Sequence, residues 1–88
     1  MYLHLGQSVV VPDSSVVGVF DLDNTTGSAI TRELLRRAER EGRVESVTQE
    51  LPRSFVLCDD GAERRIYLSQ LSAATLLKRS ESGGLGVL

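Results

Sequence analysis

Three arginines spaced four residues apart have the most suggestive chemistry in this chain. Arg32, Arg36 and Arg40 would lie along one side of an α-helix, because residues four apart share a helix face. Arginine donates planar, bidentate hydrogen bonds that fit phosphate groups, and the chain has nine arginines against one lysine. The spacing therefore indicates a surface that could bind a polyanion through its phosphates, as duplex DNA is bound.

Four further cations extend this candidate surface. Arg43 would fall on the same flank if the last helical turn extended that far, and Arg53 precedes a predicted strand. Two more arginines lie in a predicted hairpin. The candidate DNA-contacting residues are Arg32, Arg36, Arg40, Arg43, Arg53, Arg64 and Arg65.

The helix that would carry the first arginines has clear start and stop signals. Ser28 is a good N-cap, and Gly42 suits the left-handed residue after a helix. An apolar stripe at helical spacing runs between them, formed by Ile30, Leu34, Leu35 and Ala38. A second row alternates in sign through Glu33, Arg37 and Glu41. The row formed by Arg32, Arg36 and Arg40 contains no acidic residue. If these arginines pair with glutamates of the neighbouring row, this side of the helix is an ordinary solvated face.

A second motif with possible chemistry is Asp21-Leu-Asp23, which follows an apolar run. It resembles the first motif of haloacid-dehalogenase-type phosphatases, where one aspartate is the nucleophile and the next the general acid. That chemistry also requires a downstream lysine and a doubly wound parallel sheet, and the one lysine here is Lys78 in the last predicted helix. We therefore expect Asp21 and Asp23 to end a strand and turn the chain, with a phosphatase as a minor alternative.

The remaining candidates for catalysis or metal binding are weak. His4 is the single histidine, and Cys58 lies inside an apolar strand, where we expect it to be a small core residue. We expect no catalytic site, no metal site and no cofactor. One cysteine excludes an internal disulfide, and neither a signal peptide nor a membrane-spanning run is present, which favours a soluble cytoplasmic protein that does not bind membranes.

Length and composition indicate one small domain. The chain has 88 residues, no Trp and a net charge of −2. Its core must consist mainly of Val, Leu and Ile, and a core of this size leaves a small stability margin that oligomerisation would increase. Residues 28–43 nevertheless hold five arginines against three glutamates, and such local patches matter more than net charge for polyanion binding.

Turn and periodicity signals predict the order of elements. Short strands are expected over residues 2–5 and 8–11, and residues 16–22 form an apolar run typical of a strand covered on both faces. After the helix, strands are expected over residues 43–48, 54–58 and 65–68, with Asp59-Asp60-Gly61 as a hairpin turn. A short helix follows. The predicted fold is α+β, a small, mostly antiparallel sheet covered by one long helix, with a domain over residues 1–79 and a flexible tail over 80–88.

Several short pieces together resemble the bacterial extracellular matrix regulatory protein family, of RemA/RemB type and closest to its RemB branch. The resemblance covers residues 1–79 and rests on Met1-Tyr-Leu-His-Leu-Gly6, Phe20-Asp-Leu-Asp23, Ser28-Ala-Ile-Thr-Arg-Glu-Leu-Leu35, Arg53-Ser-Phe-Val-Leu57, Ile66-Tyr-Leu-Ser69 and Thr75-Leu-Leu-Lys-Arg79. It implies a cytosolic bacterial protein that binds double-stranded DNA, regulates transcription of biofilm-matrix genes and forms a ring-like homo-oligomer.

The chain departs from the family pattern before the Arg53 strand. RemA-type members carry an Arg-Arg pair there that is implicated in DNA contact, whereas this sequence reads Gln49-Glu-Leu-Pro-Arg53. Only Arg53 approximates that pair, so the helix arginines or Arg64 and Arg65 would have to replace it. An oligomeric scaffold or protein-interaction module that does not bind DNA is the alternative.

Overall fold

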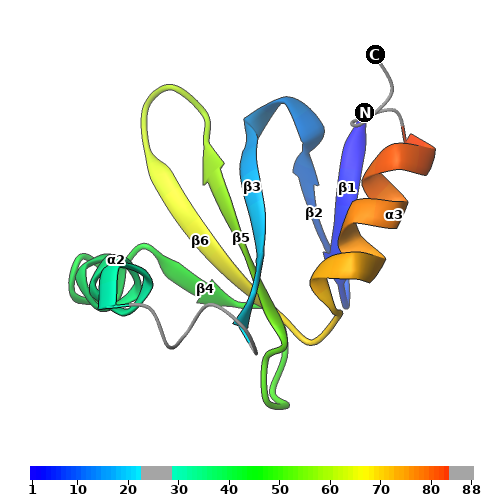
Figure 1. Ribbon diagram of the computed structural model, residues 1–88. Helices are drawn as coiled ribbons and strands as arrows, with labels where there is room; N and C mark the ends of the chain where they lie inside the picture. The colour runs from blue at the N-terminus through cyan, green and yellow to red at the C-terminus, as the bar shows by residue number, and fades with distance from the viewer. Residues whose placement is uncertain (23–28, 84–88) are drawn as a thin grey trace.

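The computed structural model describes residues 1–22 and 29–83 of the chain (Figure 1). The described elements are β1 (Tyr2–Gly6), β2 (Val9–Pro12), the short 3-10 helix η1 (Asp13–Ser15), β3 (Val16–Asp21), α2 (Ala29–Arg40), β4 (Val44–Ser46), β5 (Ser54–Asp59), β6 (Arg64–Ser69) and α3 (Ala73–Gly83). The predicted loop over residues 23–27, the predicted N-cap Ser28 and the last five residues of the predicted tail lie outside the described residues.

The strands form two separate sheets. β1 and β2 pair only with each other, as an antiparallel hairpin. The other four strands have the order β3-β5-β6-β4, in which β5 is antiparallel to both β3 and β6. β4 pairs in parallel with β6, with Val44 opposite Ile66. The sheet edges are therefore β3 and the three-residue strand β4.

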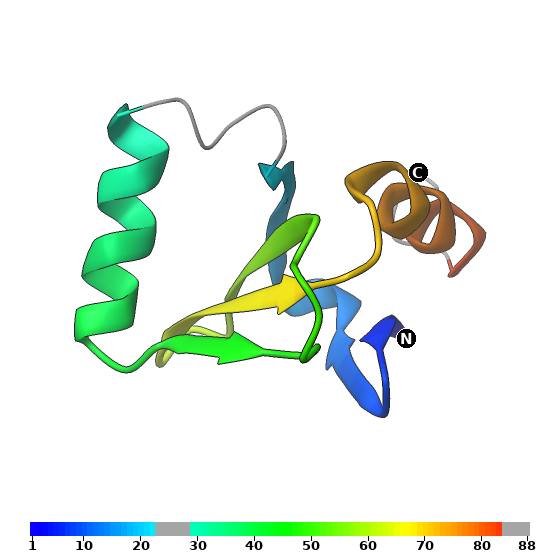
Figure 2. The same ribbon diagram turned by 90° about the horizontal axis from the view of Figure 1, so that it is seen from below.

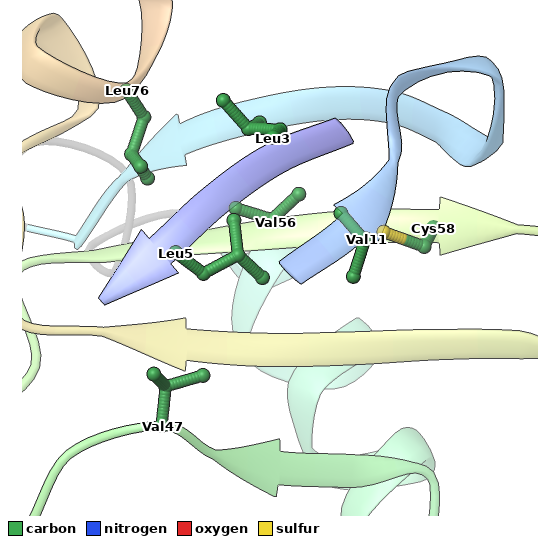
Figure 3. Close-up of a cluster of buried hydrophobic side chains, with 7 residues drawn as sticks. All are labelled: Leu3, Leu5, Val11, Val47, Val56, Cys58 and Leu76. Atoms are coloured by element: carbon green, nitrogen blue, oxygen red, sulfur yellow. The ribbon is translucent and has the colours of Figure 1, made fainter. Parts of the chain in front are cut away.

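One face of the four-stranded sheet is covered by the N-terminal hairpin and α3. Strand neighbours point to opposite faces, so Val56 and Cys58 lie on this face of β5, where Val56 is fully buried. They pack in a cluster with Leu3, Leu5, Val11, Val47 and Leu76 (Figure 3). The first and last described elements of the chain thus share the main core, and α3 contacts β1 directly.

The opposite face holds a second cluster in which α2 takes part. Phe55 and Ile66 are buried there together with Ala38 of α2. The Phe20 ring stacks on Phe55, with centroids 4.8 Å apart and ring planes 17° from parallel. α2 contacts β4 and β6, and Leu34 on the same helix remains 38% exposed. The helix therefore covers only part of this face.

The predicted fold, one sheet covered by one long helix, is wrong. There are two sheets, and among the described residues α2 has twelve residues and α3 has eleven, so the two helices are nearly equal in length. Figures 1 and 2 both place α2 on one side of the molecule, near β4 and β6, and α3 on the other side, beside β1. The reason is that β1 and β2 leave the main sheet and occupy, with α3, the face that a single covering helix would need.

The expectation that residues 16–22 form a strand covered on both faces is confirmed only in part, because Val16 and Val19 pack against one cluster and Phe20 and Leu22 against the other, each of them only half-buried. β3 is an edge strand, and Val17 is 63% exposed. The strand buried on both faces is β5, where the adjacent residues Phe55 and Val56 are each almost inaccessible to solvent. Both β3 and β5 have a near-continuous apolar sequence, and only their positions, β3 at the edge of the sheet and β5 inside it, explain why β5 is more buried.

Two buried serines tie the hairpin, β5 and α3 together. Ser69 Oγ donates a hydrogen bond to the Leu5 carbonyl oxygen at 2.6 Å and accepts one from the Leu71 amide at 3.1 Å. Ser54 Oγ donates to the Leu71 carbonyl oxygen at 2.7 Å. Both serines are fully buried. These bonds satisfy backbone groups of β1 and of the segment leading into α3 that would otherwise be buried without partners.

Candidate nucleic-acid interface

The C-terminal end of α2 is held in a defined geometry that positions Arg43. Gly42 has φ of +70°, the left-handed conformation predicted for it. The Gly42 amide donates to the Glu39 carbonyl oxygen at 3.1 Å, and the Arg43 amide donates to the Ala38 carbonyl oxygen at 2.9 Å. This pair of bonds is the Schellman motif, which ends the helix and turns Arg43 toward the sheet.

Two of the predicted arginines on α2 line a groove between the helix and the sheet. Arg32 and Arg36 lie along it with Glu39, above apolar side chains from the sheet and its connections. The hollow has a volume of ≈ 350 Å³. Its other lining residues are Leu22, Leu35, Val44, Pro52 and Leu68. The groove thus combines cations on one wall with an apolar floor.

The arginine flank of α2 has no acid in its own row, but Glu33 of the neighbouring row pairs with it, as the alternative interpretation of a solvated face expected. Glu33 Oε2 lies 3.3 Å from Arg36 Nη1, and Glu33 Oε1 lies 3.7 Å from Arg40 Nη2. One carboxylate is therefore shared by two guanidinium groups. Arg32 forms no ion pair with any described residue. Because exposed ion pairs contribute little net stability, a phosphate could replace Glu33 as the partner of Arg36 and Arg40.

The other side of α2 brings together arginines that are distant in sequence. Arg37, Arg43 and Arg64 line a second hollow, of ≈ 150 Å³, between α2, β5 and β6. Arg37 was absent from the predicted DNA-contacting residues, because it belongs to the helix row in which positive and negative charges alternate. The available signal was its position beside Ala38 and three residues after Leu34, which puts it at the border of the apolar stripe.

The pair Arg64 and Arg65 does not form one surface, because successive strand residues point to opposite faces. Arg65 lines a separate small hollow with Cys58 and Tyr67, and its Nη2 lies 3.1 Å from Glu63 Oε1. Arg53 is exposed and follows Pro52, one of the residues lining the α2 groove. The structure therefore groups Arg32 and Arg36 in one hollow and Arg43 and Arg64 in another, and places Arg65 apart from both.

The hairpin turn that carries Arg64 is ordered by two aspartates. Asp60 Oδ1 accepts hydrogen bonds from the amides of Ala62 and Glu63, each at 2.9 Å, and these two bonds lower the pKa of the Asp60 carboxyl group. Asp59 Oδ1 accepts from the Gly61 amide at 2.9 Å, while Asp59 Oδ2 lies 3.2 Å from Arg64 Nε. The predicted hairpin turn is confirmed, and its carboxylates orient the turn and Arg64.

The phosphatase-like motif has a different setting from the one its chemistry requires. Asp21 is the last residue of β3, which pairs antiparallel with β5, whereas the phosphatases use a doubly wound parallel sheet. Asp23 lies outside the described residues. Within residues 1–22 and 29–83, no three His, Cys, Asp or Glu side chains are grouped as metal ligands. In the same part of the chain, no helix is both long and apolar enough to cross a membrane.

The fold and its arginines define a small two-sheet protein with a cationic helix on one side and no recognisable catalytic constellation among the described residues. Residues 2–79 match the model of a protein family described as RemA-like, extracellular matrix regulatory protein A-like. The chain belongs to this family, as its sequence motifs predicted. It is 35% identical over 81 residues to extracellular matrix regulatory protein B of Bacillus subtilis (strain 168), covering 92% of this chain and 91% of that protein.

Proposed function

We propose that this protein regulates extracellular-matrix genes of a bacterial biofilm by binding double-stranded DNA as a cytoplasmic homo-oligomer. Membership of the extracellular matrix regulatory family supports the regulatory role. The observation that carries DNA binding is the concentration of arginines on and around α2, from Arg32 at its first turns to Arg43 just after its end. Arg64 lines a hollow beside α2 with Arg37 and Arg43. Arg53, which follows Pro52 of the α2 groove, and Arg65, which lines a separate hollow, would add two further cations.

The contacts of this region favour binding to the phosphate backbone. Its arginines are exposed or half-buried, and their carboxylate partners Glu33, Glu41 and Asp59 are exposed or half-buried too, so that a phosphate can displace them. Backbone contacts position a protein on DNA without reading its sequence. A single copy presents only a few such cations on a chain of net charge −2, so side-by-side copies would strengthen binding.

Two features of the surface support self-association. Among the described strands, β3 forms one edge of the four-stranded sheet, and a strand from another copy could pair with it there. Large apolar side chains are also exposed, with Val17 at 63% and Leu51 at 88%. Burying such side chains between copies would add apolar burial that the small core lacks. Size-exclusion chromatography with light scattering measures the assembly, and a strictly monomeric protein at micromolar concentration would contradict this part of the proposal.

A gel shift with duplex DNA at low salt tests the DNA-binding part. We expect retardation that weakens steeply as salt rises, with a smaller salt slope in Arg32→Gln and Arg36→Gln, because each lost phosphate contact lowers the slope by about 0.9. Arg79→Gln on α3 is the matched control, since it removes one exposed arginine on the other side of the molecule. No retardation by an assembled sample well above micromolar concentration would refute DNA binding.

The alternative function is an oligomeric scaffold without DNA binding. The sharing of Glu33 by Arg36 and Arg40 favours it, because arginines already near a carboxylate could equally pair with acids of a neighbouring copy. The double substitution Arg36→Glu with Arg40→Glu separates the two functions. Loss of assembly supports the scaffold, whereas loss of DNA retardation with assembly intact supports the DNA-binding regulator.

A further inference from the structure

The hollow lined by Arg37, Arg43 and Arg64 has the composition of an anion-binding site. Its three guanidinium groups come from α2, from the residue that follows the helix terminus, and from β6. The other lining residues in the described part of the chain are Leu34, Ala38, Leu57 and Ile66, and none of them is acidic. Three cations thus converge over an apolar floor, from positions up to 27 residues apart in the chain.

The backbone is held in place at two of the three arginines, although the Arg64 side chain itself is 68% exposed. The Arg43 amide donates to the Ala38 carbonyl oxygen at 2.9 Å, while the Ile66 amide donates to the Arg43 carbonyl oxygen at 2.8 Å. Arg43 is therefore held to both α2 and β6. Arg64 lies opposite Asp59 in the antiparallel register. A site whose residues are already positioned loses less entropy when a ligand binds.

The charge around the hollow is only partly compensated. Arg43 pairs with Glu41, and Arg64 Nε lies 3.2 Å from Asp59 Oδ2. Arg37 forms no ion pair with any residue in the described ranges. The carboxylates of Glu41 and Asp59 are 47% and 34% exposed, respectively, so water screens both pairs. Glu63 lines an adjoining hollow with Arg43 and Arg64, but its carboxylate pairs with Arg65. The three arginines and the two carboxylates paired with them therefore leave one positive charge in excess and several guanidinium donors for an anion.

Size and chemistry together select the ligand. A hollow of ≈ 150 Å³ has room for a group as small as a phosphate, and it is too small for a large polyanion segment to enter. Guanidinium groups bind phosphate oxygens in bidentate geometry. The apolar floor fits a carbon substituent on the phosphate better than a second charged group.

We propose that this hollow binds the phosphoryl group of a small phosphate monoester, whose apolar portion rests on the floor formed by Leu34, Leu57 and Ile66. A DNA backbone phosphate offers the same chemistry, but it is joined to charged neighbours that the apolar floor does not complement. The site does not depend on DNA binding, so it would make the protein responsive to a phosphorylated small molecule whether or not it binds DNA.

Titration of the ¹⁵N-labelled full chain with phenyl phosphate, with inorganic phosphate and with duplex DNA tests the proposal. We expect phenyl phosphate to shift the amide signals of Arg37, Arg43 and Arg64 in a saturable way and to bind more tightly than inorganic phosphate. Arg37→Gln should weaken phenyl phosphate binding by about tenfold or more, because it removes charge-assisted hydrogen bonds. Arg32→Gln, on the same helix but lining the other groove, should leave it unchanged.

Three results would overturn the proposal. The first is the absence of saturable shifts at these residues with either small probe. The second is equal weakening of phenyl phosphate binding by Arg37→Gln and Arg32→Gln, which would indicate nonspecific attraction to the helix. The third is that only duplex DNA shifts the three arginines, which would assign the hollow to a backbone phosphate. Arg64→Gln repeats the test from β6, so a local disturbance of α2 cannot decide the outcome.

Discussion

Replacement of Gly42 by alanine tests whether the helix terminus positions the arginine hollow. Gly42 has φ of +70°, and a Cβ added there would meet no atom within 4 Å. The expected cost therefore comes from the backbone alone, about 1–2 kcal/mol for an L-residue in the left-handed region. The reduced entropy of the unfolded chain returns about 0.4–1 kcal/mol of this. The net loss in unfolding free energy should be about 1 kcal/mol.

Two assays measure the effect of Gly42→Ala. Urea unfolding should show a lower midpoint at an unchanged slope, and thermal unfolding should show a Tm lower by about 4–8 °C for a domain of this size. Phenyl phosphate binding should weaken as well, because the Arg43 amide is part of the same terminus. A chemically synthesised chain with D-alanine at position 42 should retain both stability and binding, since a D-residue favours positive φ.

Gly6→Ala is the matched control for this experiment. Gly6 has φ of +114° in the β1–β2 hairpin, and its added Cβ would lie 3.7 Å from Val47 Cγ1, an ordinary contact. The substitution should also destabilise the chain but should leave phenyl phosphate binding unchanged, because the hairpin contributes no residue to the hollow. Equal stability of the L-alanine and D-alanine chains at position 42 would refute the reasoning.

Three further outcomes are expected. Ser69→Ala should lower the unfolding free energy by about 1–3 kcal/mol, because it leaves the Leu5 carbonyl oxygen and the Leu71 amide without their hydrogen-bond partner. Urea unfolding measures this loss, and a value near zero would contradict the prediction. The Cys58 thiol should react with a disulfide reagent only after unfolding, since the side chain is 6% exposed and burial raises its pKa; rapid reaction of the native protein would contradict this. Stability should also fall as the pH rises above the ordinary thiol pKa of 9.0. Burial raises the pKa of Cys58 and of Tyr67 in the folded protein, so the unfolded chain loses these protons at lower pH and is favoured as the pH rises. A Tm that does not change between about pH 8 and 10.5 would contradict this prediction.

Local elements were predictable because their signals are local. The strand over residues 54–58, the Asp59-Asp60-Gly61 turn and the helix terminus at Gly42 lie where periodicity and turn chemistry placed them. Each depends on residues within a few positions of one another. The same holds for the family, which short motifs in a fixed order identified.

Partner choice between distant elements was not predictable in the same way. The residues of Tyr2–Gly6 and Val9–Pro12 carry no signal that these strands pair only with each other. No local signal indicates that β4 aligns in parallel with β6 either. The grouping of Arg43 with Arg64 depends on that parallel pairing, because β4 begins one residue after Arg43 and lies beside β6. The sequence therefore identified most of the cationic residues but could not show which of them share a hollow.

The packing of α3 against β1 has a consequence for the order of folding during synthesis. The ribosome makes the N-terminal hairpin first and α3 last among the described elements, yet Leu3, Leu5 and Leu76 are buried in one cluster. The emerging hairpin must therefore expose its apolar face until nearly the whole chain has been released. A nascent chain arrested before residue 73 should remain open to proteases and chaperones, and folding should complete in one late step after α3 leaves the tunnel.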